Sequence, residues 1–256
     1  MVTDRRPNAA GAVGPPDAAR LSDIALRVSQ CPLCPLHSTR TKAVPGEGSA
    51  RSGIMLVGEA PGRNEDIQGR PFCGAAGRNL DLALAQAGID RAACFVTSIV
   101  KCRPPGNRDP TPFEKEACRP YLMEQVAAVR PKVLVALGRH GLSGLIGYVP
   151  RDFADLPGTF LEGPGGVPVW VSLHPAAVIY RQKWKERYLA DWNSFGHWLR
   201  SGEPAPLRPT PPPPPVGRAN PGVRGKPRRQ TSAPATPTPV SGASPLETMG
   251  RRRPSS

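Results

Sequence analysis

Between about residue 22 and residue 200, short apolar runs alternate with stretches in which apolar residues recur at helical spacing. Apolar runs bounded by Gly and Pro are typical of buried strands, whereas the spacing of Leu80, Leu84 and Ala87 is typical of a helix that packs along one side. Thr111 and Glu114 have the spacing of a capping box at a helix start. The pattern predicts strands at 54–57, 95–100, 133–137 and 167–173, and helices at 21–28, 75–87, 112–129, 138–146 and 183–199.

The alternation of strands and helices predicts an α/β fold with three layers, α/β/α, around a central, mostly parallel four-stranded sheet. Right-handed crossovers place the loops after parallel strands on one edge, so loops 59–66 and 98–108 and the pair His174-Pro175 are expected to meet there. Ligands of open α/β sheets bind at that edge. The first of these loops is rich in Gly, Pro and acidic residues, which makes it the first candidate for a functional site.

Both ends of the chain lack the pattern of a folded domain. Residues 1–20 show no periodicity, and residues 201–256 are rich in Pro and contain few large apolar side chains. Such segments bury too little apolar surface to offset their ordering entropy, so we expect two disordered ends around one domain at 21–200. The second segment carries nine Arg or Lys and two Glu. Two interpretations of it stay open: it strengthens nonspecific DNA binding by neutralising phosphates, or it only solubilises the chain.

The charge of the chain indicates a class of partner. Arg and Lys number 34 against 20 Asp and Glu, a formal net charge of +14, and this excess favours a polyanion such as nucleic acid. No apolar run approaches the roughly 20 residues of a membrane helix, and the N-terminus has no hydrophobic signal core. We therefore expect a cytoplasmic protein, monomeric and without a membrane partner.

Four of the six cysteines have the arrangement of a metal site. Cys31 and Cys34 are a C-x2-C pair, and Cys102 and Cys118 lie on either side of a Pro-Pro-Gly turn. In a cytosolic chain, such residues are free thiols or metal ligands more often than disulfides. By spacing alone, four thiolates suit zinc and an iron–sulfur cluster equally well. The other two cysteines are interpreted as packing residues.

Four motifs, GEAPGRNED, GRPF, KCRPPGNR and HPAAV, together resemble the family 4 uracil-DNA glycosylases, the iron–sulfur branch of the uracil-DNA glycosylase superfamily. The resemblance covers about residues 30–199. It implies an α/β/α fold and a structural 4Fe-4S cluster held by Cys31, Cys34, Cys102 and Cys118. It also implies an activity: excision of uracil from single- or double-stranded DNA by hydrolysis of the N-glycosidic bond, which leaves an abasic site in base excision repair.

The resemblance implies catalytic roles for three residues of the edge loops. Gly58 and Glu59 fall on the first catalytic motif, and Ala60 stands where relatives with an Asp water activator place that Asp. Glu59, or a polar neighbour such as Asn107, is then left to position the water. His174 matches the histidine that donates a hydrogen bond to uracil O2, where preorganised donors stabilise the developing negative charge.

The resemblance also implies a substrate-binding set, which Gly58 and Ala60 complete. Glu65 matches the residue that walls off the C5 edge of uracil and rejects the thymine methyl, and Phe72 matches the aromatic that stacks on the flipped base. Ser98 occupies a position that is often Asn in the family. Because a hydroxyl cannot make the two-point contact of an amide, an altered base preference stays open.

Three basic residues of the second loop, Lys101, Arg103 and Arg108, flank the pocket and are expected to hold DNA phosphates. Two other functions stay open. One is a catalytically weak or inactive iron–sulfur module that binds damaged DNA, for which Ser98 is the only sequence feature. The other is a relative that traps its product covalently through a His on an inserted basic loop; no such loop appears near Arg139-His140, which is typical of a helix start.

Overall fold

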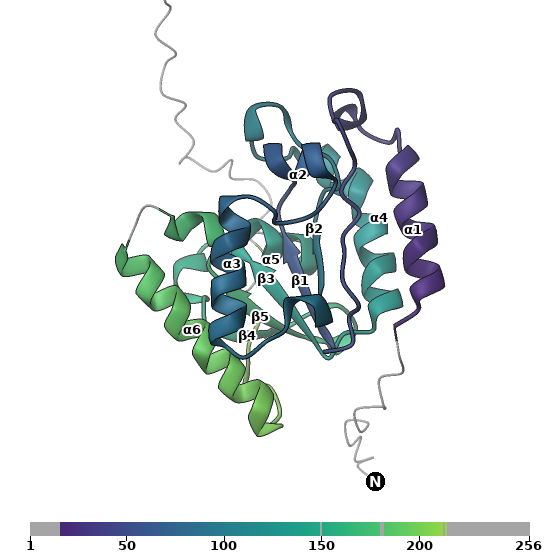
Figure 1. Cartoon of the computed structure of the whole chain (residues 1–256). Coiled ribbons are helices and arrows are strands. Elements are labelled where there is room, and N and C mark those ends of the chain that lie inside the picture. The colour runs from purple at the N-terminus through teal and green to yellow at the C-terminus, as the bar shows by residue number, and fades with distance from the viewer. Residues whose placement is uncertain (1–15, 149, 180–181, 212, 214–256) are drawn as a thin grey trace, which may run out of the picture. The chain divides into compact units, whose positions relative to one another are not determined.

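A computed structural model describes residues 16–148, 150–179, 182–211 and 213 (Figure 1). Its helices are α1 (Ala18–Gln30), α2 (Arg63–Gln68), α3 (Ala75–Gln86), α4 (Pro112–Val129), α5 (Gly138–Ile146) and α6 (Gln182–Ser201). Its strands are β1 (Ile54–Gly58), β2 (Phe95–Ser98), β3 (Val133–Leu137), β4 (Phe160–Glu162), β5 (Pro168–Ser172) and β6 (Leu207–Arg208). Most of both predicted disordered ends, residues 1–15 and 214–256, lies outside the described residues.

These strands form one sheet in the order β2-β1-β3-β5-β4-β6. Neighbours among β2, β1, β3 and β5 are parallel, with Met55 of β1 opposite Phe95 on one side and Leu134 on the other. These are the four strands that the apolar runs predict, so the predicted parallel sheet is confirmed. β4 is antiparallel to β5, and β6 is parallel to β4.

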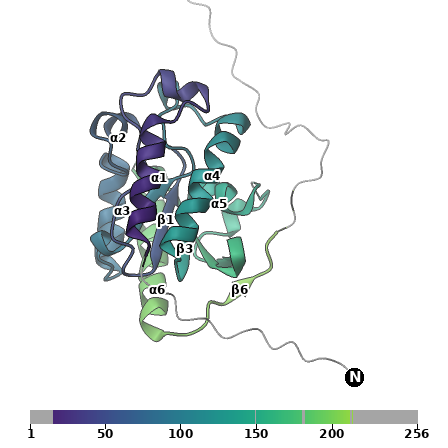
Figure 2. The same cartoon turned by 90° about the vertical axis from the view of Figure 1, so that its right-hand side faces the viewer.

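Helices cover both faces of the sheet, so the predicted three layers are confirmed. α1, α4 and α5 lie on one face, and α3 and α6 lie on the other (Figures 1 and 2). Successive side chains of a strand point to opposite faces. In β1, Met55 and Val57 therefore join the core under α1, α4 and α5, whereas Ile54 and Leu56 join the core under α3 and α6. All residues of β1 and β3 are buried, which explains why both strands read as continuous apolar runs.

The predicted number of strands is wrong, because two short strands extend the sheet without an apolar run in the sequence. β4 has three residues, the last of them exposed, and is followed by Gly163 and Pro164. β6 has two exposed residues between Pro206 and Pro209, and proline is tolerated only at sheet edges because it removes a ladder hydrogen bond. Since β6 lies within 201–256, the prediction that this whole segment is disordered is wrong for its first residues.

Capping residues explain where two helices begin. The Asp17 side chain accepts a hydrogen bond from the Arg20 N–H, so α1 begins at Ala18, inside the segment that was predicted to be disordered. α4 begins where the sequence predicts. Thr111 Oγ1 accepts from the Glu114 N–H at 3.2 Å, and the Glu114 carboxylate accepts from the Thr111 N–H at 2.7 Å.

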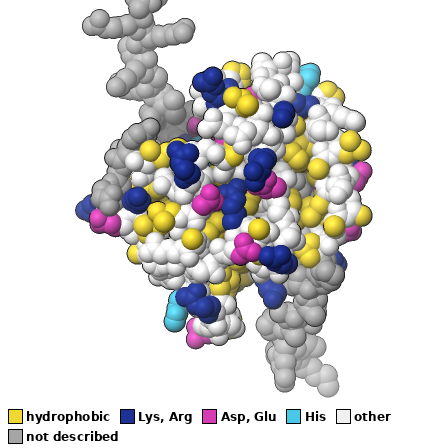
Figure 3. Space-filling view, viewed as in Figure 1, with side chains coloured by type: hydrophobic (Ala, Val, Ile, Leu, Met, Phe, Trp, Pro, Cys, Tyr) yellow, Lys and Arg dark blue, Asp and Glu magenta, His cyan; other side chains and the backbone are white. Residues whose placement is uncertain are grey.

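The surface of the described residues mixes charges of both signs. Figure 3 shows Lys and Arg side chains among Asp and Glu on the face viewed in Figure 1. Arg70 and Arg91 both pair with Glu47, and Arg91 also pairs with Asp81. Part of the basic charge of the domain is therefore balanced locally. Among the described residues, no helix combines the length and the apolar character that crossing a membrane requires.

Candidate active site

The loops after β1, β2 and β5 meet at the carboxyl edge of the sheet and enclose a cavity of about 400 Å³, which we call the edge pocket. This is the edge at which the strand order predicts a ligand site. Its lining consists of Val44, Glu59, Ala60, Pro61, Gly62, Glu65, Pro71, Phe72, Ala76, Ser98, Pro104, Asn107, Arg108, Asp109, His174 and Ala176. Most of the predicted site residues are thus brought together, while their chemical roles stay predictions.

Phe72 covers the end of β1 because Gly58 has no side chain. A Cβ atom on Gly58 would lie 2.5 Å from Phe72 Cζ and 3.4 Å from Ser98 Oγ, and the first distance is far inside van der Waals contact. Phe72 is 8% exposed and has a left-handed backbone, with φ of 51°, which is uncommon for an aromatic residue. The ring of the predicted stacking residue is therefore packed directly against Gly58.

The Glu65 carboxylate organises the loop after β1. Its Oε1 accepts from the N–H groups of Cys73 and Gly74, both at 3.0 Å, and its Oε2 accepts from the Gly62 N–H at 3.1 Å. These bonds tie the start of α2 to the segment that carries Phe72. Glu65 also lines the edge pocket, in addition to this structural role. Its contact with the C5 edge of a base stays a prediction.

His174 lies two residues after the end of β5. A hydrogen bond from the backbone to its ring determines which ring nitrogen carries the proton. Nδ1 accepts from the Ala176 N–H at 3.1 Å, so the proton of the neutral ring is on Nε2. Burial, and then the nearby His140, lower the pKa of His174 to about 4. The ring centroid is 6.1 Å from that of Phe72. A neutral imidazole N–H beside an aromatic face is suited to donate to a carbonyl oxygen of a planar ligand.

Two residues near Glu59 were not predicted. His140 Nε2 lies 3.3 Å from Asp109 Oδ2 and 3.9 Å from Glu59 Oε1. Burial, reinforced by the negative charge of Asp109, raises the pKa of Glu59 to about 7. His140 could have been found from its place after β3, since that parallel strand ends at the same edge. Asp109 directly follows Arg108 on a loop that the sequence had already singled out.

The remaining predicted residues of the loop after β2 have partners within that loop or near it. Ser98 ends β2 and is 5% exposed. Asn107 accepts from Arg103 Nε at 2.7 Å. Arg108 donates to both oxygens of Glu114, at 2.8 and 2.6 Å, and these bonds lower the pKa of Glu114 to about 2. Both arginines are therefore held in position by these bonds, and Arg108 also lines the pocket, while their predicted phosphate contacts stay predictions.

The prediction that Lys101 holds a DNA phosphate is wrong, because its side chain is 1% exposed. Its Nζ donates to Thr97 Oγ1 and Ser98 O, both at 2.6 Å, and to Gln125 Oε1 at 2.7 Å. Burial lowers the pKa of Lys101 to about 8. The amine thus uses all its donors inside the protein. A basic residue next to a pocket loop is not distinguishable in sequence from one that points into the core.

The four predicted metal ligands, Cys31, Cys34, Cys102 and Cys118, line one small cavity beside α1 and α4, and they form no disulfide. Arg40 donates to Cys102 Sγ at 3.1 Å, a contact that favours the thiolate. Burial raises the pKa of three of the thiols, those of Cys34, Cys102 and Cys118. Four cysteines around one cavity offer sulfur donors, which suit a soft metal centre, zinc or iron–sulfur, and not calcium or magnesium.

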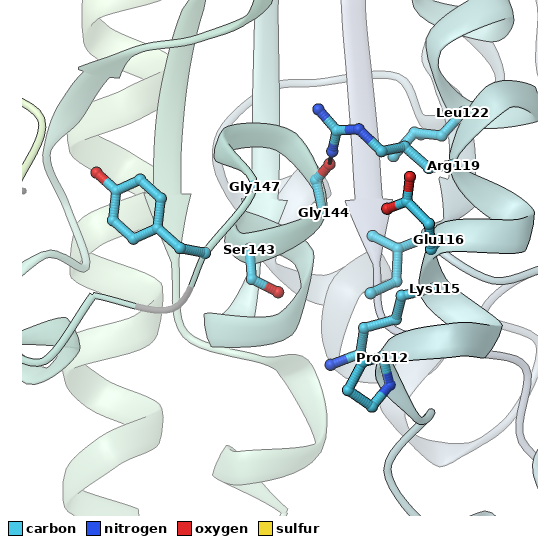
Figure 4. A pocket seen from close by; sticks show the side chains of 10 residues that line it. Pro112, Lys115, Glu116, Arg119, Leu122, Ser143, Gly144 and Gly147 are labelled. Carbon is cyan, nitrogen blue, oxygen red and sulfur yellow. Dashed lines mark hydrogen bonds between the residues drawn. The ribbon is translucent and has the colours of Figure 1, made fainter. Parts of the chain in front are cut away.

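A second cavity, of about 470 Å³, lies between α4 and α5 (Figure 4). Lys115, Glu116 and Arg119 of α4 face Ser143 and Gly144 of α5 across it, and Arg119 donates to the Gly144 carbonyl at 2.7 Å. It contains none of the predicted site residues. Lys115 nevertheless reaches toward the edge pocket, because its amine lies 3.3 Å from Nδ1 of His140, whose Nε2 is 3.9 Å from Glu59 of that pocket.

The fold and the edge pocket define the class of protein. It is a three-layer α/β/α domain whose pocket, at the carboxyl edge of a parallel sheet, combines an aromatic ring, a neutral imidazole and a carboxyl group, with a four-cysteine centre nearby. The model of the "Uracil DNA glycosylase superfamily" matches residues 45–195. Every residue that lines the edge pocket, except Val44, lies within this match.

Curated relatives narrow the family. The chain is 41% identical over 190 residues to the type-4 uracil-DNA glycosylase of Archaeoglobus fulgidus, covering 72% of this chain and 96% of the relative. It is 42% identical over 174 residues to that of Pyrobaculum aerophilum, covering 66% and 89%, and 32% identical over 152 residues to the type-5 enzyme of the same organism, covering 54% and 67%. This chain therefore belongs to the uracil-DNA glycosylase superfamily, and within it to the type-4 uracil-DNA glycosylases. The resemblance drawn from the motifs is confirmed.

Proposed function

We propose that this chain is a DNA-repair glycosylase that excises uracil from DNA. In this hydrolysis the bond between uracil N1 and deoxyribose C1′ breaks, and its electron pair leaves with the base. The oxygen of a water bonds to C1′, and a proton of that water ends on the departing base. The products are uracil and an abasic site. Positive charge develops on the sugar and negative charge on the base, so the protein needs an anion near one and donors near the other.

The pairing of Phe72 with His174 in the edge pocket is the observation that carries this proposal. The target bond is inaccessible in stacked DNA, so the nucleotide leaves the stack and enters the pocket. Phe72 stacks on the flipped base. His174 Nε2–H donates to uracil O2 as negative charge develops there. Because the pKa of His174 is about 4, the ring stays neutral throughout the neutral pH range.

Glu59 supplies the anion. Ala60 has no carboxylate, so in this proposal Glu59, which lines the pocket, is the acidic group of the first motif that acts on the water and on C1′. Asn107, which also lines the pocket, is the second polar group available to the water. The carboxyl must be ionised to stabilise a positive charge. Since its pKa is about 7, excision should rise as pH increases through that value.

The four-cysteine centre holds a 4Fe-4S cluster in this proposal, with Cys31, Cys34, Cys102 and Cys118 as ligands. When bound, the cluster supplies folding free energy and fixes the loops that carry its ligands. Purified protein should absorb broadly near 400 nm and contain iron and acid-labile sulfide in equal amounts. Cys102→Ala should lose the colour, whereas Cys73→Ala, outside the centre, should keep it. Stoichiometric zinc in a colourless, active protein would overturn the assignment.

Three finer properties complete the proposal. Glu65 closes the side at which the C5 methyl of thymine would lie, so uracil is preferred over thymine. The protein acts as a monomer in the cytoplasm. Paired oligonucleotides with uracil or thymine, light scattering of the purified protein and cell fractionation test these three statements separately.

Single-turnover excision from an oligonucleotide with one deoxyuridine, followed by alkali, tests the function. His174→Ala should lower the rate by about two to three orders of magnitude, as expected for one transition-state donor, with little change in DNA affinity. His197→Ala, an exposed histidine on α6, is the matched control and should cleave at the parent rate. A pure, folded protein that binds uracil-containing DNA without cleaving it would instead be the inactive DNA-binding module.

A further inference from the structure

The Arg40 guanidinium connects two parts of the four-cysteine centre. Its Nη1 donates to Cys102 Sγ and to the Cys31 carbonyl, both at 3.1 Å, and its Nη2 donates to the Ser29 carbonyl at 2.7 Å. Ser29 and Cys31 lie at the carboxyl end of α1, where the last carbonyl groups of a helix have no partner within it. One planar cation therefore holds the end of α1 against the loop that carries Cys102.

The backbone that follows Arg40 is held by a different part of the molecule. The N–H groups of Thr41 and Lys42 donate to Asp66 Oδ1, at 2.9 and 3.4 Å. Asp66 belongs to α2 and is only 3% exposed. Because a buried carboxyl group is unfavourable without hydrogen bonds, these two bonds determine where Asp66, and α2 with it, lies relative to the backbone after Arg40.

α2 also carries a wall of the edge pocket. Glu65 lines that pocket and accepts from three backbone N–H groups on either side of Phe72 in the chain. The neighbouring carboxyl groups of Glu65 and Asp66 thus bind in two directions, one to the pocket loop and the other to the backbone after Arg40. Val44 lines the pocket as well. Residues 40–44, which we call the bridging segment, therefore reach the pocket directly at Val44 and through α2 at Glu65.

We propose that Arg40 and Asp66 are positioning residues that connect the four-cysteine centre with the edge pocket. Arg40 fixes the bridging segment to a predicted metal ligand, and Asp66 fixes it to the helix that carries Glu65. The inference rests on the proposed function, because a purpose for the connection requires excision in the pocket. It also assigns Arg40 an effect on the centre itself, since loss of a hydrogen-bond partner of a metal ligand typically lowers metal affinity by about 10- to 100-fold.

The connection predicts effects that purely local roles would not have. If Arg40 only caps α1, its loss lowers the stability of the fold without changing excision by the folded, metal-loaded protein. If Asp66 only holds α2, its loss leaves the metal centre unchanged, because its two hydrogen bonds end on Thr41 and Lys42 and not on a cysteine. In a connected pair, the loss of each residue also acts at the other site.

The experiment compares four single variants of the full chain, Arg40→Gln, Asp66→Ala, Asp66→Asn and Arg51→Gln, with the double variant Arg40→Gln/Asp66→Ala. Arg51 is the matched control, because its guanidinium pairs with Asp90 and its side chain is 68% exposed. Asp66→Asn tests the contact itself, because the amide oxygen can still accept from both N–H groups. Metal analysis before and after incubation with EDTA gives the rate of metal release. Single-turnover excision is measured only on protein with full metal content.

Arg40→Gln should release metal roughly 10- to 100-fold faster than the parent and, when loaded, should excise uracil about 5- to 30-fold more slowly, the effect of one or two lost hydrogen bonds. Asp66→Ala should slow excision by a similar factor and should also release metal about 2- to 30-fold faster, because it loosens the bridging segment. Asp66→Asn and Arg51→Gln should match the parent in both measurements. In the double variant the two losses in excision should not add, since either one breaks the same connection.

Melting temperatures establish that each variant is folded at the assay temperature. Arg40→Lys, which keeps the charge but not the planar fork, replaces Arg40→Gln if that variant does not fold. Parent metal release in Asp66→Ala, parent excision in loaded Arg40→Gln, or strictly additive losses would each overturn the connection, as would a parent protein that holds no metal. A parent protein that holds metal but excises no uracil would instead defeat the proposed function, and metal release from Asp66→Ala would still decide the connection.

Discussion

Replacing Gly58 with Ala should remove the predicted stacking ring from its place while leaving every polar group of the pocket intact. The new Cβ would lie 2.5 Å from Phe72 Cζ, whereas carbon atoms in contact stay about 3.5–4.0 Å apart. The ring must therefore move by roughly 1 Å or more. Its backbone cannot follow, because a Cβ on Gly77 would lie 1.8 Å from the Phe72 carbonyl oxygen, which shows how closely α3 packs against it.

Two outcomes bound the cost of Gly58→Ala. If Phe72 stays, the overlap should destabilise the fold by about 1–3 kcal/mol, as overpacking does in other cores. If the ring swings away, the protein loses base stacking worth about 1–3 kcal/mol, which corresponds to roughly 5- to 150-fold in rate. Thermal unfolding measures the first cost, and single-turnover excision of uracil measures the second.

A double-mutant cycle tests whether Phe72 is the cause. In a Phe72→Ala background the new methyl meets no ring, so Gly58→Ala should add little to the loss from Phe72→Ala alone. Strictly additive losses would show that Gly58 acts through another contact, such as the one at 3.4 Å to Ser98 Oγ. Parent activity and parent stability in Gly58→Ala would refute the packing argument itself.

Three further predictions follow from single residues or segments. Ser98→Asn should preserve or raise uracil excision, since an amide can pair with the base edge at two points. Ser98→Ala should instead cost about 1–2 kcal/mol for one lost hydrogen bond. Single-turnover rates of both variants test this, and an inactive but folded Ser98→Asn would show that the pocket reads the base differently. Truncation after Pro213 should keep the melting temperature and weaken the salt-dependent part of DNA binding. Truncation after Ser201 also removes β6 and leaves β4 unpaired on one side, so it should lower the melting temperature. Lys101→Met should lower the free energy of unfolding by roughly 2–4 kcal/mol in denaturant titration, because Ser98 O and Thr97 Oγ1 lose a buried charged donor. A variant with the stability of the parent would show that water replaces the amine.

The four parallel strands could be predicted because burial on both faces leaves an uninterrupted apolar run in the sequence. Val133 to Leu137 are all fully buried, and an apolar run of this length, shortly after Pro131 and directly before Gly138, favours a strand over a helix. β4 and β6 carry no comparable signal, because an edge strand of two or three residues depends on backbone pairing with a neighbour that is distant in sequence. Their positions follow from the sheet and not from their own side chains.

The site residues could be predicted where they belong to a sequence motif. They could not be predicted where only the fold brings them close to the pocket. Glu59, Phe72 and His174 lie in recognisable motifs, and the structure places them around one pocket. His140 has no motif. It enters the site because Gly141 lets α5 approach β1, a contact between residues 57 and 141 that no local pattern reports. Lys101 shows the opposite error, since its position beside a pocket loop suggested exposure, whereas its amine is bonded inside the protein.

The buried Lys101 also explains how a metal centre can matter to a hydrolytic reaction without taking part in it. Its carbonyl accepts from the N–H of Val44, which lines the edge pocket, and its amine holds Ser98 O, at the end of β2. The next residue, Cys102, is a predicted metal ligand. The amine also binds Gln125 of α4, the helix that carries Cys118. A metal held by these cysteines would therefore fix the backbone from Ser98 to Cys102, and we expect its loss to act on excision through the geometry of the pocket and not through electron transfer.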